Sequence, residues 1–145
     1  ASHPRDSMRP LTLRGKQQAL STGNALFHMS PSDLHVICSA AKRTVETLAQ
    51  WTSRSDWPGS TDLHADLYLA NCKTLLQHIC NTDDRITDVC ILAHNPGTSE
   101  LIHYLSRQHH GLEPGEIVQT ALSVKSWSEV SEGFGQLIRI FKPES

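Results

Sequence analysis

Long apolar runs, a dominant sign of charge and closely spaced cysteines are all missing from this sequence of 145 residues. No apolar run approaches the roughly 20 residues that a membrane-spanning helix needs, and no signal-peptide pattern opens the chain. Thirteen Lys and Arg against fifteen Asp and Glu give a formal charge of −2, without a block of one sign. These absences argue against a membrane protein. They also argue against a nucleic-acid-binding protein, which needs a concentrated basic face.

The four cysteines show no C-x-x-C spacing and lie in apolar surroundings; they are Cys38, Cys72, Cys80 and Cys90. We therefore expect buried thiols in a reducing compartment, and a cytoplasmic protein, rather than a disulfide framework or a zinc site. The nine histidines are scattered and no H-E-x-x-H pattern occurs, so we expect no metal and no cofactor. The length fits a single domain, residues 1–145.

The periodicity of apolar residues predicts strands alternating with helices along most of the chain. We expect helices over residues 12–29 with Thr12 as N-cap, 40–51 with Ser39 as N-cap, 66–80, and from Thr98 onward. We expect buried strands over residues 34–38 and 88–93, two further strands within 116–127 and 136–141, and a loop over 52–61. This order predicts an α/β protein, a three-layer α/β/α sandwich around a mostly parallel sheet.

In such sheets the chemistry gathers at the carboxyl ends of the strands, which here are residues 39–43 and 94–98. Arg43 lies one turn into a helix, where the free N–H groups and the helix dipole favour an anion, and its planar fork suits two phosphate oxygens. His94 lies where a buried strand stops. Each residue also has an ordinary interpretation, since Arg43 fits a solvated helix surface and His94 fits a structural turn.

Three motifs, in their order along the chain, favour the functional interpretation of Arg43 and His94 over the ordinary one. R-P-L-T-x-x-G-x-x-Q-A occupies residues 9–19, S-x-x-x-R-x-x-E-T occupies 39–47, and A-H-N-P-G occupies 93–97. Their order and intervals resemble the histidine phosphatase superfamily, which has the phosphoglycerate mutase-like fold, and most of all its small SixA-type phosphohistidine phosphatases. The elements at residues 67–70 and 141–143 resemble the same branch, so the likeness spans nearly the whole chain.

The resemblance implies a phosphatase, with a role in signal transduction, that hydrolyses phosphohistidine of a protein or a small phosphoester and releases inorganic phosphate. The family forms a covalent phosphohistidine intermediate without a metal. Arg43 matches the arginine that clamps the phosphoryl oxygens, His94 matches the second histidine of the pocket, and Arg9 is a candidate third phosphate ligand. Asp62 and Asp66 are candidates for the general acid by rough position only, and a solvated or helix-capping role fits them better. We expect a monomer.

One family motif is absent. The family's first strand ends in Arg-His-Gly, whose histidine is the nucleophile, and no Arg-His-Gly occurs in these 145 residues. His3 is no substitute, because Pro4 follows it and no strand precedes it. We expect the intact protein to carry a leading strand of about ten residues that supplies this motif. The alternative is a catalytically inactive module that binds phosphate or a phosphoprotein through Arg9, Arg43 and His94.

Overall fold

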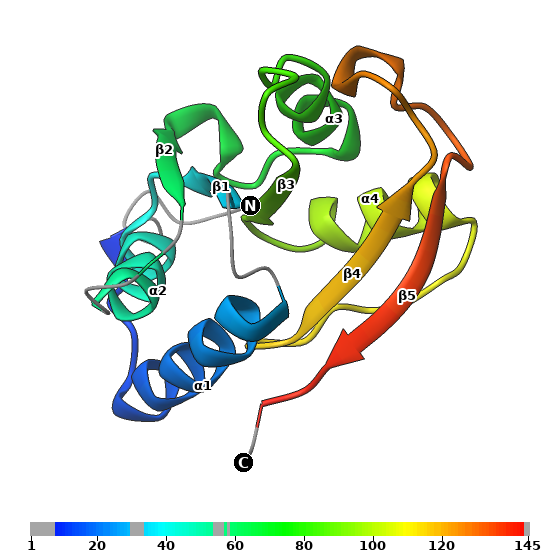
Figure 1. The fold of residues 1–145 in the computed structure, drawn as a ribbon. Helices are drawn as coiled ribbons and strands as arrows, with labels where there is room; N and C mark the ends of the chain where they lie inside the picture. The colour runs from blue at the N-terminus through cyan, green and yellow to red at the C-terminus, as the bar shows by residue number, and fades with distance from the viewer. Residues whose placement is uncertain (1–7, 30–33, 54–56, 58, 144–145) are drawn as a thin grey trace.

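The computed structural model describes residues 8–29, 34–53, 57 and 59–143. The helices are α1 (Leu13–Met29), α2 (Lys42–Thr52), α3 (Cys72–Cys80) and α4 (Gly97–Ser106), with 3-10 helices η2 (Ala65–Leu67) and η3 (Trp127–Glu129). The strands are β1 (Leu34–Ser39), β2 (Ser60–His64), β3 (Asp88–Leu92), β4 (Ile117–Leu122) and β5 (Gly135–Phe141) (Figure 1). His3 and the turn expected at residues 30–33 lie outside the described residues.

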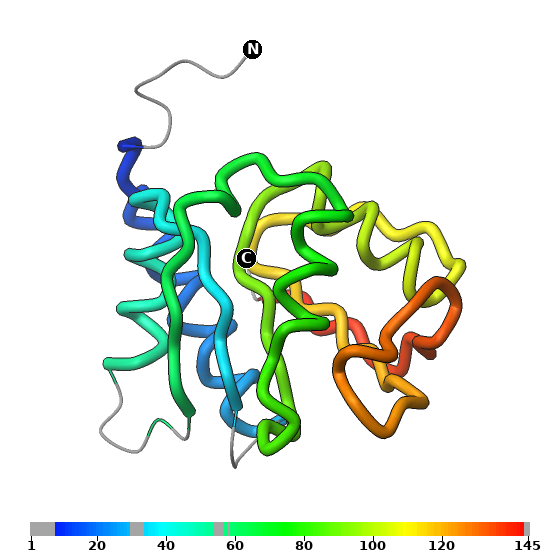
Figure 2. Tube along the Cα trace, turned by 90° about the horizontal axis from the view of Figure 1, so that it is seen from above, coloured from blue at the N-terminus to red at the C-terminus, as the bar shows by residue number. Residues whose placement is uncertain are grey.

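The predicted layers are confirmed. Strands β1, β2 and β3 form a parallel sheet in the order β2-β1-β3. Helices α1 and α2 lie on one side of it and α3 and α4 on the other (Figure 2). Alternate residues of β1 enter the two cores, with Val36 and Cys38 packing toward Leu48 of α2 and Ile37 packing toward Leu75 of α3. A strand buried on both faces needs such a nearly continuous apolar run, which is why residues 34–38 could be found from the sequence.

The last two strands do not extend this sheet. β4 and β5 form a separate antiparallel hairpin, and α4 packs against both strands. β3 pairs only with β1, and β4 only with β5, so among the described residues each of them has one edge without a partner strand. In Figure 1 the two edges lie on either side of a gap between β3 and β4. The sheet is therefore split where a continuous one was expected.

The first helix begins as the sequence predicts. The hydroxyl of Thr12 accepts a hydrogen bond from the N–H of Gly15 at 3.0 Å, and α1 runs from Leu13 to Met29. Its buried side packs on α2, where Gly23 faces the ring of Trp51. A Cβ on Gly23 would come within 2.7 Å of that ring, so the glycine permits the close approach of the two helices.

Three local predictions are wrong. Residues 60–64, expected within a loop, form the edge strand β2; its side chains are mostly exposed and polar, so it lacks the apolar signature of a buried strand. The helix expected over 66–80 is two elements, η2 and α3, because Leu69 takes a positive φ of 55° and Asn71 caps α3. Ser39 is not the cap of α2. That position belongs to Ala41, and Ser39 ends β1 instead.

The described chain has no disulfide, and its four cysteines are free thiols, as expected. Only Cys38 is fully buried, while the other three are partly exposed, so the expectation of burial holds for one of the four. Burial raises the pKa of Cys38 to about 12 and, together with the nearby Cys38, that of Cys90 to about 12. Within the described residues no helix is both long enough and apolar enough to cross a bilayer.

Candidate functional site

The ends of two neighbouring strands meet through a direct side-chain contact. Ser39 is the last residue of β1, and its hydroxyl is hydrogen-bonded to Nε2 of His94, just beyond β3, at 2.8 Å. Ser39 is 0% exposed, and its oxygen also accepts the N–H of Ala41 at 3.2 Å. The tautomer of His94 decides which of the two groups is the donor. The serine therefore fixes the imidazole of His94 at the carboxyl edge of the sheet.

The turn after His94 is held by one amide side chain. Asn95 Oδ1 accepts hydrogen bonds from the hydroxyl of Thr98 at 2.8 Å and the N–H of Ser99 at 3.2 Å, and Nδ2 donates to the carbonyl of Leu112. The backbone N–H of Thr98 donates to the carbonyl of His94 at 3.1 Å. These bonds join the first turn of α4 to the segment before β4, so the backbone that carries His94 is tightly held.

A second segment covers His94 from the side. The rings of Tyr68 and His94 meet edge to face, with centroids 5.2 Å apart at 78°. The same segment approaches α4 at Gly97, where an added Cβ would lie 2.0 Å from the carbonyl oxygen of Ala70. Only glycine fits that contact, so the motifs at 67–70 and 93–97 are in direct contact in space.

Arg43 comes from the start of α2. The cap residue Ala41 has only a methyl group and offers no acceptor to the first-turn N–H groups. Thr44 donates its hydroxyl to the carbonyl of Ser39 at 2.8 Å, which ties this turn to the end of β1. An uncapped helix N-terminus has free N–H groups and a partial positive charge. With the exposed guanidinium of Arg43 added, the turn suits an anion with several oxygens.

Arg43 and His94 line one cavity, of about 1070 Å³. Arg43 and His94 mark the polar end of the cavity. From there the cavity continues as a slot between β3 and β4, whose lining includes the apolar side chains of Ile91, Leu101 and Leu122. The structure thus places both residues on the wall of one cavity, and their joint role at a phosphate site stays a prediction. Arg9 is exposed ahead of α1 and is not among the described residues that line the cavity.

The two candidate acids pair with histidines. Asp62, in the middle of β2, lies 3.3 Å from Nε2 of His35 on β1. Asp66 lies 3.0 Å from Nε2 of His78. Neither carboxylate belongs to the described lining of the cavity. Their role as general acid stays a prediction.

Sequence reasoning missed Ser39 and Asn95 as residues that position the site. Ser39 was assigned to a helix cap, because serine after a strand and before a helix is typical of that role. Asn95 stood in the A-H-N-P-G motif without a function of its own. The usable signal was their place at the carboxyl ends of two buried strands, which are neighbours in a parallel sheet.

Comparisons with known proteins bear on the fold. A scan against protein-family models gave no match, and neither did a search of curated proteins. Among solved structures, a protein assigned as the phosphohistidine phosphatase SixA from Nakamurella multipartitia superposes with a TM-score of 0.85 at 20% identity, covering 100% of this chain and 91% of the other. A protein assigned the same way from Agrobacterium tumefaciens gives 0.74 at 18% identity, with 99% and 89% covered.

A third structure, the protein histidine phosphatase SixA complexed with tungstate, gives a TM-score of 0.79 at 20% identity, with 98% of this chain and 89% of that chain covered. Each of these likenesses extends over essentially the whole chain. The predicted fold is therefore confirmed: the chain has the fold of these SixA structures.

Proposed function

We propose that this protein is a SixA-type phosphatase that hydrolyses phosphohistidine, or a small phosphoester, through a covalent phosphohistidine intermediate. The observation that carries the proposal is the cavity at the carboxyl edge of the sheet, which Arg43 and His94 line together at the uncapped start of α2. The fold of the SixA structures agrees with it, since their names describe phosphohistidine phosphatases.

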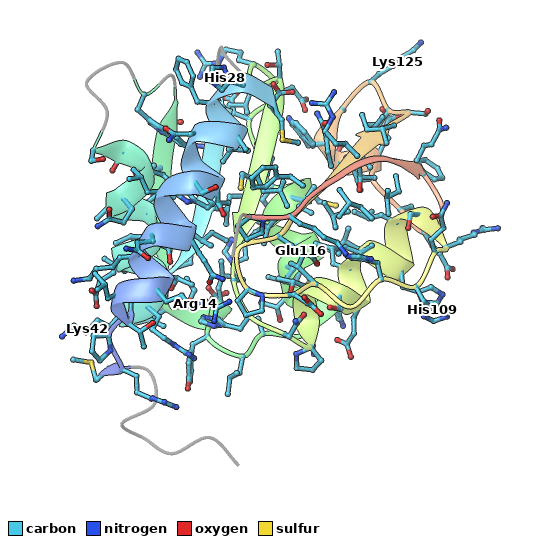
Figure 3. All side chains as sticks on the ribbon, turned by 90° about the horizontal axis from the view of Figure 1, so that it is seen from below. Arg14, His28, Lys42, His109, Glu116 and Lys125 are labelled. Carbon is cyan, nitrogen blue, oxygen red and sulfur yellow. The ribbon has the colours of Figure 1, made fainter. Side chains whose placement is uncertain are left out.

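The phosphoryl group binds where the positive groups converge. Its oxygens accept hydrogen bonds from the first-turn N–H groups of α2 and from the fork of Arg43. His94, held by Ser39, lies across the cavity end and balances the charge on the transferring group. A phosphoryl transition state spreads negative charge over its equatorial oxygens, so donors fixed in advance lower its energy most. Arg9 is proposed as a third phosphate ligand although it is not in the described lining of the cavity, because Arg14 and Lys42 show that the starts of α1 and α2 lie at one end of the molecule (Figure 3).

The nucleophile comes from an extended segment outside residues 1–145 that fills the slot between β3 and β4. Both strands offer an edge without a partner among the described residues, and the slot between them is lined by apolar side chains. The arrows of β3 and β4 point in opposite directions (Figure 1). A strand parallel to β3 would therefore pair with both edges and end beside His94, where its last residues reach the phosphoryl group.

The reaction then balances in two steps. An imidazole nitrogen at the end of the inserted strand attacks phosphorus, the bond from phosphorus to the leaving nitrogen or oxygen breaks, and the leaving group takes up a proton. Water next attacks phosphorus and the P–N bond to the histidine breaks, so that inorganic phosphate leaves and the free imidazole is restored. A phosphoramidate leaving group needs little help from an acid, and this suits a pocket whose described lining includes neither Asp62 nor Asp66.

The proposal extends to the substrate and the cellular setting. The substrate is a phosphorylated histidine side chain that another protein presents. The phosphatase works as a monomer in the cytoplasm, and its role lies in signal transduction. The free thiols agree with a reducing compartment. Size-exclusion chromatography with light scattering tests the monomer, and a mass of twice 16.1 kDa would contradict it.

The proposal is tested by adding the nucleophile strand to the protein. Residues 1–145 are extended at the N-terminus by an apolar strand of six residues, the length of β4, followed by Arg-His-Gly. We expect this protein to hydrolyse a phosphohistidine peptide and to form an acid-labile phosphoenzyme, whereas a matched extension ending in Arg-Asn-Gly does neither. Both extensions should bind tungstate. A folded, tungstate-binding His extension without turnover would contradict the catalytic proposal, and absence of tungstate binding from both would contradict the phosphate site.

A further inference from the structure

Two histidines and an aspartate meet at the end of β2, although no motif or spacing along the chain predicts this cluster. Nε2 of His78 lies 3.0 Å from one carboxylate oxygen of Asp66 and 3.2 Å from the other. The rings of His64 and His78 lie 4.3 Å apart between centroids, tilted by 51°. One donor atom of each of the three side chains lies within 4.8 Å of the others. An aspartate–histidine pair involves one imidazole, whereas here a second imidazole, that of His64, lies beside the pair.

Each of the three side chains stands on backbone that other contacts hold. His64 ends β2 opposite Ser39, and its carbonyl accepts the N–H of Ala40 at 3.2 Å. Asp66 belongs to η2, which the fully buried side chain of Leu67 anchors in the core. His78 lies on α3, and its helix is fixed by Leu75 and Ile79 in the same core. The donors are thus brought together by the fold rather than by flexible loops.

The cluster is also open enough for an ion to enter. The side chain of His78 is 20% exposed and that of Asp66 is 60% exposed. The carboxylate of Asp66 and the rings of His64 and His78 offer one oxygen and two nitrogen donors. An anionic oxygen and two imidazoles at a partly exposed position are the donors of a transition-metal site with room left for water.

We propose that His64, Asp66 and His78 bind one divalent transition-metal cation, of which Zn²⁺ is the reference member. Imidazole and carboxylate suit Zn²⁺, Ni²⁺, Co²⁺ and Cu²⁺, whereas Mg²⁺ and Ca²⁺ prefer oxygen ligands alone. With bonds of about 2.0–2.1 Å, tetrahedral ligand atoms lie about 3.3 Å apart. The contact of Asp66 with His78 therefore widens by a few tenths of an ångström, and the imidazole of His64 closes in.

Binding replaces the hydrogen bond between His78 and Asp66 by bonds to the metal. In neutral His78 the ring proton moves from Nε2 to Nδ1 by exchange with solvent, which frees the Nε2 lone pair for the cation. The other positions are taken by a nitrogen lone pair of His64, one carboxylate oxygen of Asp66 and water. The site would join β2 to α3 one strand away from Ser39. The inference does not depend on the proposed phosphatase activity, because it uses none of the groups assigned to the phosphate.

The experiment titrates Zn²⁺ into the 145-residue protein by calorimetry, in a buffer free of phosphate and chelators, and follows the visible absorption of Co²⁺ bound in its place. We expect one ion per chain and an intense tetrahedral Co²⁺ spectrum. His64→Ala, His78→Ala and Asp66→Asn should each weaken Zn²⁺ binding by at least about tenfold. Asp66→Asn keeps the shape of the side chain, so it separates loss of the ligand from loss of the fold.

The matched control is His28→Ala. His28 lies near the end of α1, at the opposite end of the molecule from Lys42 (Figure 3). Lys42 follows the end of β1, where Ser39 pairs with His64 of the cluster. Replacement of His28 should therefore leave the Zn²⁺ affinity unchanged. Circular dichroism checks that each variant is folded. The proposal is overturned if the folded protein takes up no Zn²⁺ at one per chain, or if His28→Ala weakens binding as much as His64→Ala does.

Discussion

The hydroxyl of Ser39 and Nε2 of His94 are 2.8 Å apart, although 54 residues separate them in the chain. This contact joins the carboxyl ends of β1 and β3. It makes the orientation of the imidazole a property of the parallel sheet rather than of the turn alone, so a change at Ser39 should reach the proposed phosphate pocket.

Ser39→Ala should therefore weaken anion binding as well as stability. The variant leaves the N–H of Ala41 and the ring of His94 without their common partner, and a buried polar group that loses its partner costs about 1–3 kcal/mol. Tungstate calorimetry and urea unfolding measure the two effects. Ser106→Ala, which removes a hydroxyl bonded to the carbonyl of Ile102, serves as control and should keep the tungstate affinity. Equal tungstate binding by both variants would contradict the positioning role.

Arg43→Ala should weaken tungstate binding by about tenfold to a hundredfold, since a hydrogen bond to a charged group contributes about 1.5–3 kcal/mol. In the protein extended by the Arg-His-Gly strand, Arg43→Ala should also lower turnover by several orders of magnitude, because such a donor contributes about 3–4 kcal/mol at the transition state. Lys42→Ala is the matched control, being an exposed cation one residue earlier on α2. If Lys42→Ala has the larger effect on either measurement, Arg43 is not the phosphate clamp.

Gly97→Ala should lower the free energy of unfolding by about 1–3 kcal/mol or more, because overpacking forces backbone to move. The added Cβ would lie 2.0 Å from the carbonyl oxygen of Ala70, and backbone on both sides leaves no flexible side chain to give way. Gly111→Ala is the control, since a Cβ there meets nothing within 4 Å. Thermal unfolding of the two variants should differ clearly, and a stable Gly97→Ala would show that the segment around Ala70 does not pack on α4.

Cys38 and Cys90 should resist alkylation by iodoacetamide at pH 8. Burial raises the pKa of each thiol to about 12, so at pH 8 both stay in the neutral form and little reactive thiolate is present. In unfolded protein the same thiols should react readily. Mass spectrometry of peptides after timed alkylation measures both rates. Rapid modification of native Cys38 would contradict the packing of β1 against α2.

The sequence was sufficient where apolar residues form a run. Residues 34–38 are apolar except for His35, and residues 89–93 are apolar throughout, so both runs identify strands, although β3 is only half-buried. The edge strand β2 has four mostly exposed side chains before His64, and no apolar pattern marks it. The break before α3 depends on the positive φ of Leu69, which tertiary packing imposes against local propensity.

The candidate site was predictable in part, for a different reason. Arg43 and His94 belong to short motifs whose order resembles a known family, and the fold brings both to one cavity. The contact of His64 with His78 could not be foreseen, because it depends on how the exposed strand β2 meets α3. Likewise, the division between the parallel sheet and the hairpin follows from pairing between distant segments, which composition and periodicity do not specify.

The two-sided burial of the sheet separates the tryptophans into independent optical reporters. Trp51 lies in the core under α1 and α2, and its ring stacks on that of Trp57 with centroids 6.2 Å apart. Trp127 packs on the opposite core, where its indole N–H donates to the carbonyl of Ile86 at 2.8 Å. Trp51 and Trp57 therefore report on one face of the sheet and Trp127 on the other, so that the fluorescence of a Trp127→Phe variant comes from the first face alone.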